Sequence, residues 1–150
     1  MPPITIRVQK DDFDLTAEVA SLSALSRDIG AVVTFSGVCR DEDGRLGALE
    51  LEHYPGMAEA EITRIAAEAS ARWRLLGITI VHRFGKLMPG ENIVLVATAS
   101  VHRQEAFEAA SFLMDFLKTR APFWKKEHGP ESPGWVRATA ADDEATDRWR

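Results

Sequence analysis

The 150-residue sequence lacks the features that mark secreted and membrane proteins. Its single cysteine, Cys39, rules out an internal disulfide and fits a reducing compartment. No apolar run reaches the roughly 18 residues that span a bilayer, and the N-terminus has no basic region followed by an apolar core. We therefore expect a soluble, cytoplasmic protein without a signal peptide.

Sequence patterns of several common chemistries are also missing. There is no glycine-rich phosphate loop and no serine-nucleophile elbow. His53, His82 and His128 have no metal-like spacing with one another or with Cys39, so we predict no metal site and no cofactor. The net charge of −5 argues against nucleic acid as a partner, because duplex binders usually present a broad basic face.

What is present fits one globular domain over residues 1–150, with residues 139–150 as a frayed or disordered tail. Apolar periodicity and turn residues predict helices over 15–25, 57–73 and 104–119, and strands over 4–8, 31–40, 46–54, 78–84, 92–101, 123–127 and 135–138. This order predicts an α+β fold with a mostly antiparallel sheet. We expect a hairpin-like pair of strands over residues 31–40 and 46–54, and a turn over residues 85–90.

Two of these elements are apolar on more than one side. Strand 92–101 is apolar on both faces, which indicates a central strand or one covered by a second subunit. Helix 104–119 has two apolar faces, which predicts that it is sandwiched inside the domain or at a dimer contact. One face holds Phe107, Ala110, Leu113, Met114 and Leu117, and the nearly opposite face holds Phe112 and Phe116.

A basic and aromatic stretch over 118–126 is the strongest candidate for a binding site, with four positive charges and no acid. Lys118 ends an apolar helical stripe, so we expect it to be partly desolvated and able to act as acid, base or nucleophile. The alternative is a lysine that only stabilises the helix C-terminus. Beyond Pro122, Lys125 and Lys126 face opposite ways on a strand, and we expect Lys125 to share the site of Lys118.

Two weaker candidates for anion binding lie elsewhere. His102 and Arg103 stand where the apolar strand ends and the long helix begins, and unpaired N–H groups at a helix start favour anions. The alternative is that both side chains are simply solvated. Arg40 ends the strand that carries Ser36, where it could close a pocket or pair with a neighbouring acid. Cys39 is predicted to be a small core residue rather than a nucleophile.

Several segments, in the same order along the chain, match one known family. They are Gly30-Ala-Val-Val-Thr-Phe-Ser-Gly-Val-Cys-Arg40, Leu49-Glu-Leu-Glu-His-Tyr-Pro-Gly-Met57, residues 82–90, residues 100–103, and Lys118-Thr-Arg-Ala-Pro-Phe-Trp-Lys125. The chain resembles the molybdopterin synthase large (catalytic) subunits, the MoaE family. Several long motifs in register are much more specific than any one of them.

The resemblance implies an α/β-hammerhead-type fold with three main helices that forms a homodimer. Each large subunit would bind a small ubiquitin-like sulfur-carrier subunit (MoaD-like), giving a heterotetramer. The implied activity is that of a sulfurtransferase in molybdenum cofactor biosynthesis. It would move two sulfurs from the carrier's thiocarboxylated C-terminus to cyclic pyranopterin monophosphate, forming the dithiolene of molybdopterin. The alternative is a non-catalytic dimeric adaptor that binds a ubiquitin-like tail or a phosphorylated ligand.

The resemblance also assigns roles to matching positions. Lys118 and Lys125 correspond to catalytic lysines. The positions implied in substrate binding are Val38, Cys39, Arg40, His102, Arg103, Lys118, Lys125, Lys126 and Glu127. In the family, the residues that match His102 and Arg103 reach in from the neighbouring protomer. Some members have a lysine where this chain has Val38, so any contact made by that lysine is absent here.

Overall fold

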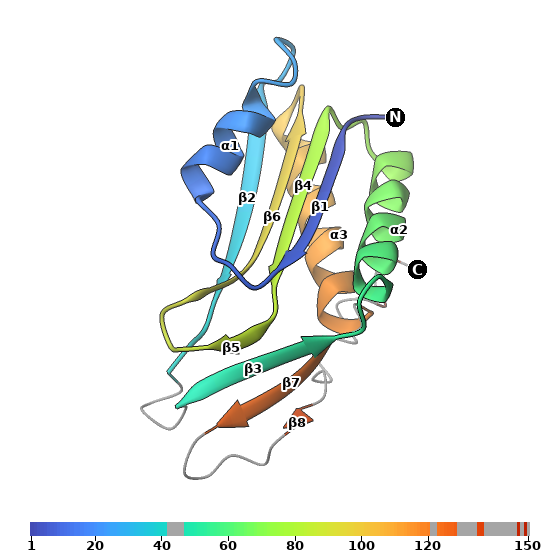
Figure 1. Ribbon diagram of the computed structural model, residues 1–150. Coiled ribbons are helices and arrows are strands. Elements are labelled where there is room, and N and C mark those ends of the chain that lie inside the picture. Colours follow the sequence, from blue (N-terminus) through green and yellow to red (C-terminus); the bar gives the residue numbers. More distant parts are fainter. Residues whose placement is uncertain (42–46, 121–122, 129–134, 137–146, 148, 150) are drawn as a thin grey trace.

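The computed structural model describes residues 1–41, 47–120, 123–128, 135–136, 147 and 149, and within 123–128 and 135–136 it describes only the side chains of Phe123 and Lys125 (Figure 1). Three helices alternate with eight strands in this part of the chain. They are β1 (Ile4–Gln9), α1 (Leu15–Ser23), β2 (Ala31–Val38), β3 (Ala48–His53), α2 (Met57–Arg72), β4 (Gly77–Arg83), β5 (Gly85–Leu87), β6 (Asn92–Ser100), α3 (Arg103–Thr119), β7 (Phe123–His128) and β8 (Trp135–Val136).

The strands form two four-stranded sheets. The first has the order β1-β4-β6-β2, in which only the β1–β4 pair is parallel. The second has the order β5-β3-β7-β8 and is antiparallel throughout. It lies across one end of the first sheet (Figure 1). The predicted α+β class with a mostly antiparallel sheet and three main helices is confirmed.

The predicted pairing of the second and third strands was wrong. β2 pairs with β6 over its whole length, while β3 belongs to the other sheet, between β5 and β7. The buried side chains of β3 explain its position, because Leu49 and Leu51 pack with Cys39 and Leu87 in a cluster of their own. The segment predicted as a turn over 85–90 includes β5 for the same reason, since Leu87 is fully buried there.

Strand β6 is central, as predicted, and both of its faces are covered. Val94 and Val96 pack into the main core with α2 and α3, while Ala97 and Ala99 pack with Leu22 of α1 on the other face. The two faces of this strand follow the two-residue repeat of extended backbone. Figure 1 shows α1 in front of the first sheet and the other two helices behind it.

Helix α3 packs on β2 and β6 of the first sheet with α2 beside it, which confirms the prediction that it is enclosed inside the domain. A buried bond from the Thr98 hydroxyl to the Ala106 carbonyl, 2.7 Å long, ties its first turn to β6. Phe112 is fully buried and packs edge-on against Trp73 of the α2 C-cap. Phe107, predicted on one of the two apolar faces, is 61% exposed in the single chain, so only the alternative of a dimer contact would cover it. The packing fixes the last turn of α3 beside the second sheet.

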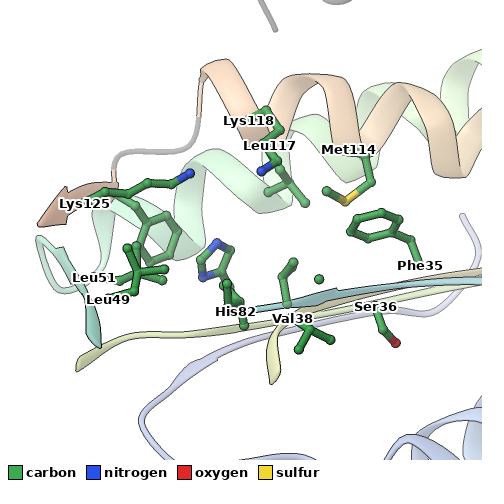
Figure 2. Close-up of a pocket in the computed structure, with 14 residues that line it drawn as sticks. Phe35, Ser36, Val38, Leu49, Leu51, His82, Met114, Leu117, Lys118 and Lys125 are labelled. Atoms are coloured by element: carbon green, nitrogen blue, oxygen red, sulfur yellow. The ribbon is translucent and has the colours of Figure 1, made fainter. Parts of the chain in front are cut away.

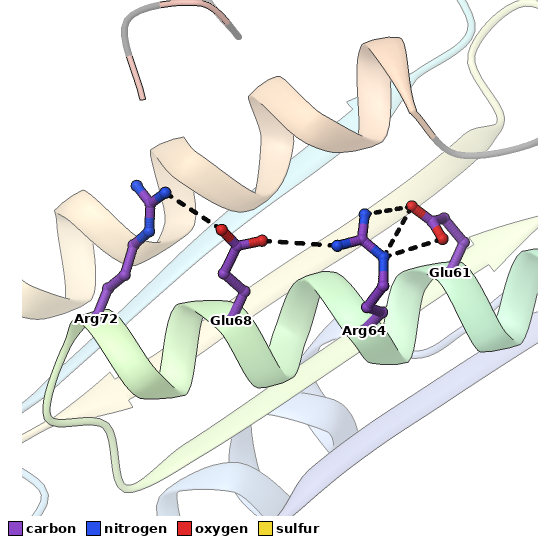
Figure 3. Close-up of polar contacts among 4 residues, drawn as sticks. All are labelled: Glu61, Arg64, Glu68 and Arg72. Atoms are coloured by element: carbon purple, nitrogen blue, oxygen red, sulfur yellow. Dashed lines mark hydrogen bonds and ion pairs between the residues drawn. The ribbon is translucent and has the colours of Figure 1, made fainter. Parts of the chain in front are cut away.

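The outer face of α2 carries a ladder of opposite charges (Figure 3). Arg64 bonds Glu61 at 3.1 Å and pairs with Glu68 at 3.8 Å, and Arg72 reaches Glu68 at 3.2 Å. Exposed pairs at this spacing contribute only about 0.3–0.5 kcal/mol each. This face is therefore a solvated surface that supports the helix.

The tail over 139–150, predicted to be frayed or disordered, lies largely outside the described residues. Within the tail, Trp149 is described: its ring packs against Trp73 and Phe112, and its indole N–H donates to Asp115. None of the described helices is long and apolar enough to cross a membrane.

Candidate active site

A cavity of about 310 Å³ lies between the C-terminal half of α3, strand β2 and the second sheet (Figure 2). This is within the usual size of pockets for small ligands. Its lining residues are Phe35, Ser36, Gly37 and Val38 of β2, Leu49 and Leu51 of β3, His82 of β4, Ile93 and Val94 of β6, Met114, Leu117 and Lys118 of α3, and Phe123 and Lys125 of β7.

The two predicted lysines meet in this pocket. Lys118 comes from the last turn of α3 and Lys125 from β7, where its backbone faces Leu51 of β3. Figure 2 shows the two side chains extending over the pocket toward each other. The expected desolvation of Lys118 was wrong, because the residue lies on the last helical turn and is exposed. The half-buried Lys125 is the more enclosed of the two.

Apolar side chains make a second part of the pocket wall. Phe35 and Val38 come from β2, and Met114 and Leu117 come from α3. Gly37 gives the wall its shape, because the β2–β6 register shifts between Gly37 and Val38. A Cβ atom at Gly37 would lie 2.7 Å from Cγ1 of Val94, so any other residue would push that side chain away. A glycine inside a strand pattern often marks such a bulge or a close backbone approach.

The two residues after Val38 do not line the pocket. Cys39 is 3% exposed and packs with Leu49, Leu51 and Leu87, with its thiol 3.9 Å from the Leu87 carbonyl oxygen. The prediction of a core cysteine is confirmed. Arg40 lies beyond the end of β2 and is exposed. The strand ends at Val38 rather than at Arg40, so the side chain is not held against the cavity.

His102 and Arg103 are not brought to this pocket within one chain. His102 is the N-cap of α3 and Arg103 its first residue, and both are exposed. Fifteen helical residues separate Arg103 from Lys118, which corresponds to about 22 Å along the axis. The backbone of Lys126 pairs with Glu50 and Trp135, and that of Glu127 with Leu49. The side chains of Lys126 and Glu127 lie outside the described part of the structure.

His82 is a pocket residue that the sequence analysis did not assign. Its side chain stacks on Phe123 with ring centroids 3.8 Å apart, and its Nδ1 lies 2.9 Å from the Arg83 carbonyl oxygen. The sequence did contain a sign of this position. In strand β4, His82 follows Ile78 and Ile80 at a spacing of two, so it points to the same inner face of the sheet.

The environment of His82 keeps its ring neutral. Burial lowers the pKa of His82 from 6.5 to about 4, and the electrostatic interactions with Lys125, Lys118 and His53 act in the same direction. The bond to the Arg83 carbonyl opposes them, because it favours a protonated Nδ1. Burial and the neighbouring cations have the larger effect on the pKa, so an uncharged imidazole faces the two lysines at neutral pH.

The lowered pKa of His82 predicts a loss of stability in mild acid. Between pH 6.5 and about 4 the unfolded chain binds a proton at His82 that the folded chain does not, so stability falls as the pH falls. The full effect is on the order of 3 kcal/mol. Urea unfolding of the wild type and of His82→Asn at pH 7 and pH 4.5 measures it. The wild type should lose more stability than the variant, and equal losses would contradict this account.

The fold and the pocket define a class of protein. This is an α+β protein whose pocket combines two lysine ammonium groups with an apolar wall, an arrangement that suits a small anionic ligand carrying a flat apolar part.

Comparison with known proteins shows which family within this class the chain belongs to. The family model described as MoaE protein matches residues 8–120. The molybdopterin synthase catalytic subunit of Mesorhizobium japonicum is 64% identical over 97% of this chain and 93% of its own length. The solved MoaE protein of Burkholderia ambifaria is 52% identical, with a TM-score of 0.85 over 99% of this chain and 98% of that one. The solved molybdopterin synthase of Staphylococcus aureus is 30% identical, with a TM-score of 0.79 over 87% and 95%. The chain belongs to the MoaE family.

Proposed function

We propose that this chain is the catalytic subunit of molybdopterin synthase. It transfers two sulfurs from the thiocarboxylated C-terminus of a small ubiquitin-like carrier to cyclic pyranopterin monophosphate, which produces the dithiolene of molybdopterin. The observation that carries the proposal is the pair Lys118 and Lys125, placed by two different elements over one pocket. The relatives named as catalytic subunits of molybdopterin synthase support it.

The chemistry of the pocket suits this reaction. The pterin substrate carries a phosphate and a flat ring, and the incoming thiocarboxylate is also an anion. Two cationic side chains offset the repulsion between these anions, and the wall of Phe35, Val38 and Met114 can receive the ring. A neutral pocket of the same shape would have to desolvate both anions without compensation.

The two lysines are assigned different roles. Lys118 transfers a proton or activates the carbonyl of the acyl intermediate formed with the carrier, and Lys125 stabilises the negative charge that develops there. The exposed position of Lys118 leaves its ammonium accessible to an incoming tail, while the half-buried Lys125 has less freedom to move. Each sulfur transfer leaves the carrier's C-terminus as a carboxylate after water has cleaved the acyl intermediate.

The complete enzyme is proposed to be a homodimer that binds two carriers, with His102 and Arg103 of one protomer acting at the pocket of the other. The name of the relatives, catalytic subunit, supports a second kind of subunit. The separation of about 22 Å between Arg103 and Lys118 on one straight helix supports supply from a second copy, because the helix itself cannot bring them together. Substrate binding is likewise assigned to Val38, Arg40, Lys126 and Glu127.

Mixed dimers test whether Arg103 of one protomer acts at the pocket of the other. Lys118→Ala and Arg103→Ala should each be nearly inactive alone, but a mixed dimer contains one pocket with both residues intact. Random pairing of equal amounts should therefore restore about a quarter of the wild-type activity. Native mass spectrometry confirms that mixed dimers have formed. No recovery in a sample that contains them would show that Arg103 does not act across the dimer.

The activity itself is tested by reconstitution. The purified chain, thiocarboxylated carrier and cyclic pyranopterin monophosphate should yield molybdopterin, detected by mass spectrometry or by the fluorescence of its oxidised form. A carrier that ends in an ordinary carboxylate is the matched control and should yield none. Binding of the carrier without any product would contradict the proposal and favour the non-catalytic adaptor.

A further inference from the structure

The orientation of the His82 ring is fixed from two sides. Its Nδ1 is 2.9 Å from the Arg83 carbonyl oxygen, and a carbonyl can only accept, so Nδ1 carries the hydrogen. The ring face lies on Phe123 with an interplanar angle of 14°. In the neutral ring that results, Nε2 has no hydrogen and its lone pair is a hydrogen-bond acceptor.

The stack also ties His82 to the strand that carries Lys125. Phe123 and Lys125 are two residues apart on β7, so they project from the same side of the strand, and both line the pocket. The ring of His53 of β3 also lies near Phe123, with ring centroids 5.7 Å apart. His82 therefore faces the pocket from a position set by the same strand as the lysine (Figure 2).

Among the described residues, the charged groups that act on the His82 ring are the ammonium groups of Lys125 and Lys118. Lys125 of β7, Lys118 of α3 and His53 of β3 act on its ring, and on its own strand it contacts a backbone carbonyl. A carboxylate in this place would hold a lysine equally well but would cancel the charge that two anionic reactants require. A neutral acceptor orients an ammonium group and leaves its charge intact.

We propose that His82 is a positioning residue whose Nε2 accepts a hydrogen bond from the ammonium group of Lys125. An ammonium has three N–H donors, so this bond leaves two for other partners, and it directs them toward the reacting groups. The inference rests on the proposed sulfur transfer, because that reaction is what needs an oriented and fully charged lysine. It adds a residue that the motif comparison did not assign.

Two substitutions separate this role from a structural one. The side-chain amide N–H of His82→Asn can replace Nδ1 as donor to the Arg83 carbonyl, but this variant has no acceptor at the place of Nε2. The longer side chain of His82→Gln can put an amide oxygen near the place of Nε2, but it gives up the bond to Arg83. If His82 has only a structural role, His82→Asn should keep more activity than His82→Gln. If His82 positions Lys125, His82→Gln should keep more activity than His82→Asn.

The expected result is a loss of about 10- to 100-fold in kcat for His82→Asn, with KM for the pterin changed less than about threefold. His82→Gln should stay within about fivefold of the wild-type kcat, even if its melting temperature is the lower of the two. Wild-type activity in His82→Asn, or equal losses of kcat in the two variants, would overturn the proposal.

Nitrogen NMR of the wild-type imidazole tests the tautomer of His82 and the hydrogen bond at Nε2 without any variant. A neutral His82 with its hydrogen on Nδ1 at pH 7 and a hydrogen-bonded Nε2 supports the proposal, and an Nε2–H tautomer or a charged ring overturns it. This measurement uses only the wild type, so it can be made even if neither variant folds. If the wild type makes no molybdopterin, the proposed function fails, and the tautomer of His82 still tests the bond to Lys125.

Discussion

Replacing Lys118 by alanine is expected to lower molybdopterin formation by at least about 10²- to 10³-fold, the usual effect of removing one group that stabilises charge in a transition state. Lys118 is exposed on the last turn of α3, so its removal leaves no cavity and should cost only a few tenths of a kcal/mol of stability through the helix dipole. The loss of activity should therefore occur in a folded protein that still binds its carrier.

The matched control is Lys86→Ala, which removes another exposed lysine, from β5 and outside the pocket. It should keep wild-type activity, so a similar loss in both variants would point to net charge rather than to the site. Lys118→Arg separates the two roles considered for Lys118, because arginine keeps the charge but does not release a proton near neutral pH. Turnover of Lys118→Ala close to the wild type would contradict any catalytic role.

Replacing Phe112 by alanine is expected to lower the free energy of unfolding by about 3–5 kcal/mol, as for other large aromatic residues in cores. Phe112 is fully buried, and its ring contacts those of Trp73, Phe116 and Trp149 at centroid distances of 5.3, 4.8 and 5.7 Å. Since this cluster holds α3 against α2, the variant should also have lower activity at temperatures near its melting point.

Phe107→Ala is the control, since it removes the same side chain from the same helix at a position that is 61% exposed. It should change the stability of the isolated chain by no more than about 0.5 kcal/mol. Urea unfolding of the two variants measures the difference. A loss at position 107 as large as that at position 112 would contradict the placement of the two rings.

The limits of the sequence-based fold prediction are seen best in β2 and β3. Local periodicity predicted both strands, but it carries no information about which strands pair across the chain. Their separation into two sheets depends on long-range contacts, such as Leu51 with Leu87 and Val33 with Thr98. The exposure of Phe107 in the single chain could not be predicted for a related reason, because a helix with two apolar faces does not show from its own sequence which face the same chain covers.

The candidate site could be predicted only in part. The basic stretch and its motif led to Lys118 and Lys125, and the structure places both over one pocket. Spacing within β4 could place His82 on the inner face of the sheet, but it could not place it beside Phe123 and Lys125, which lie more than forty residues later and reach it through the second sheet. The buried position of Cys39 was predicted correctly, because a free cysteine next to an alternating strand usually behaves as a small hydrophobic core residue.

The most direct test of the central claim is a crystal structure of this chain bound to a carrier with its C-terminal Gly-Gly tail. The claim is that the cavity between α3, β2 and β7 is where the tail and the pterin meet. We predict that an oxygen or sulfur of the terminal group lies within about 3.2 Å of the ammonium group of Lys118 or Lys125. A tail bound elsewhere on the surface, with both lysines out of its reach, would contradict the account.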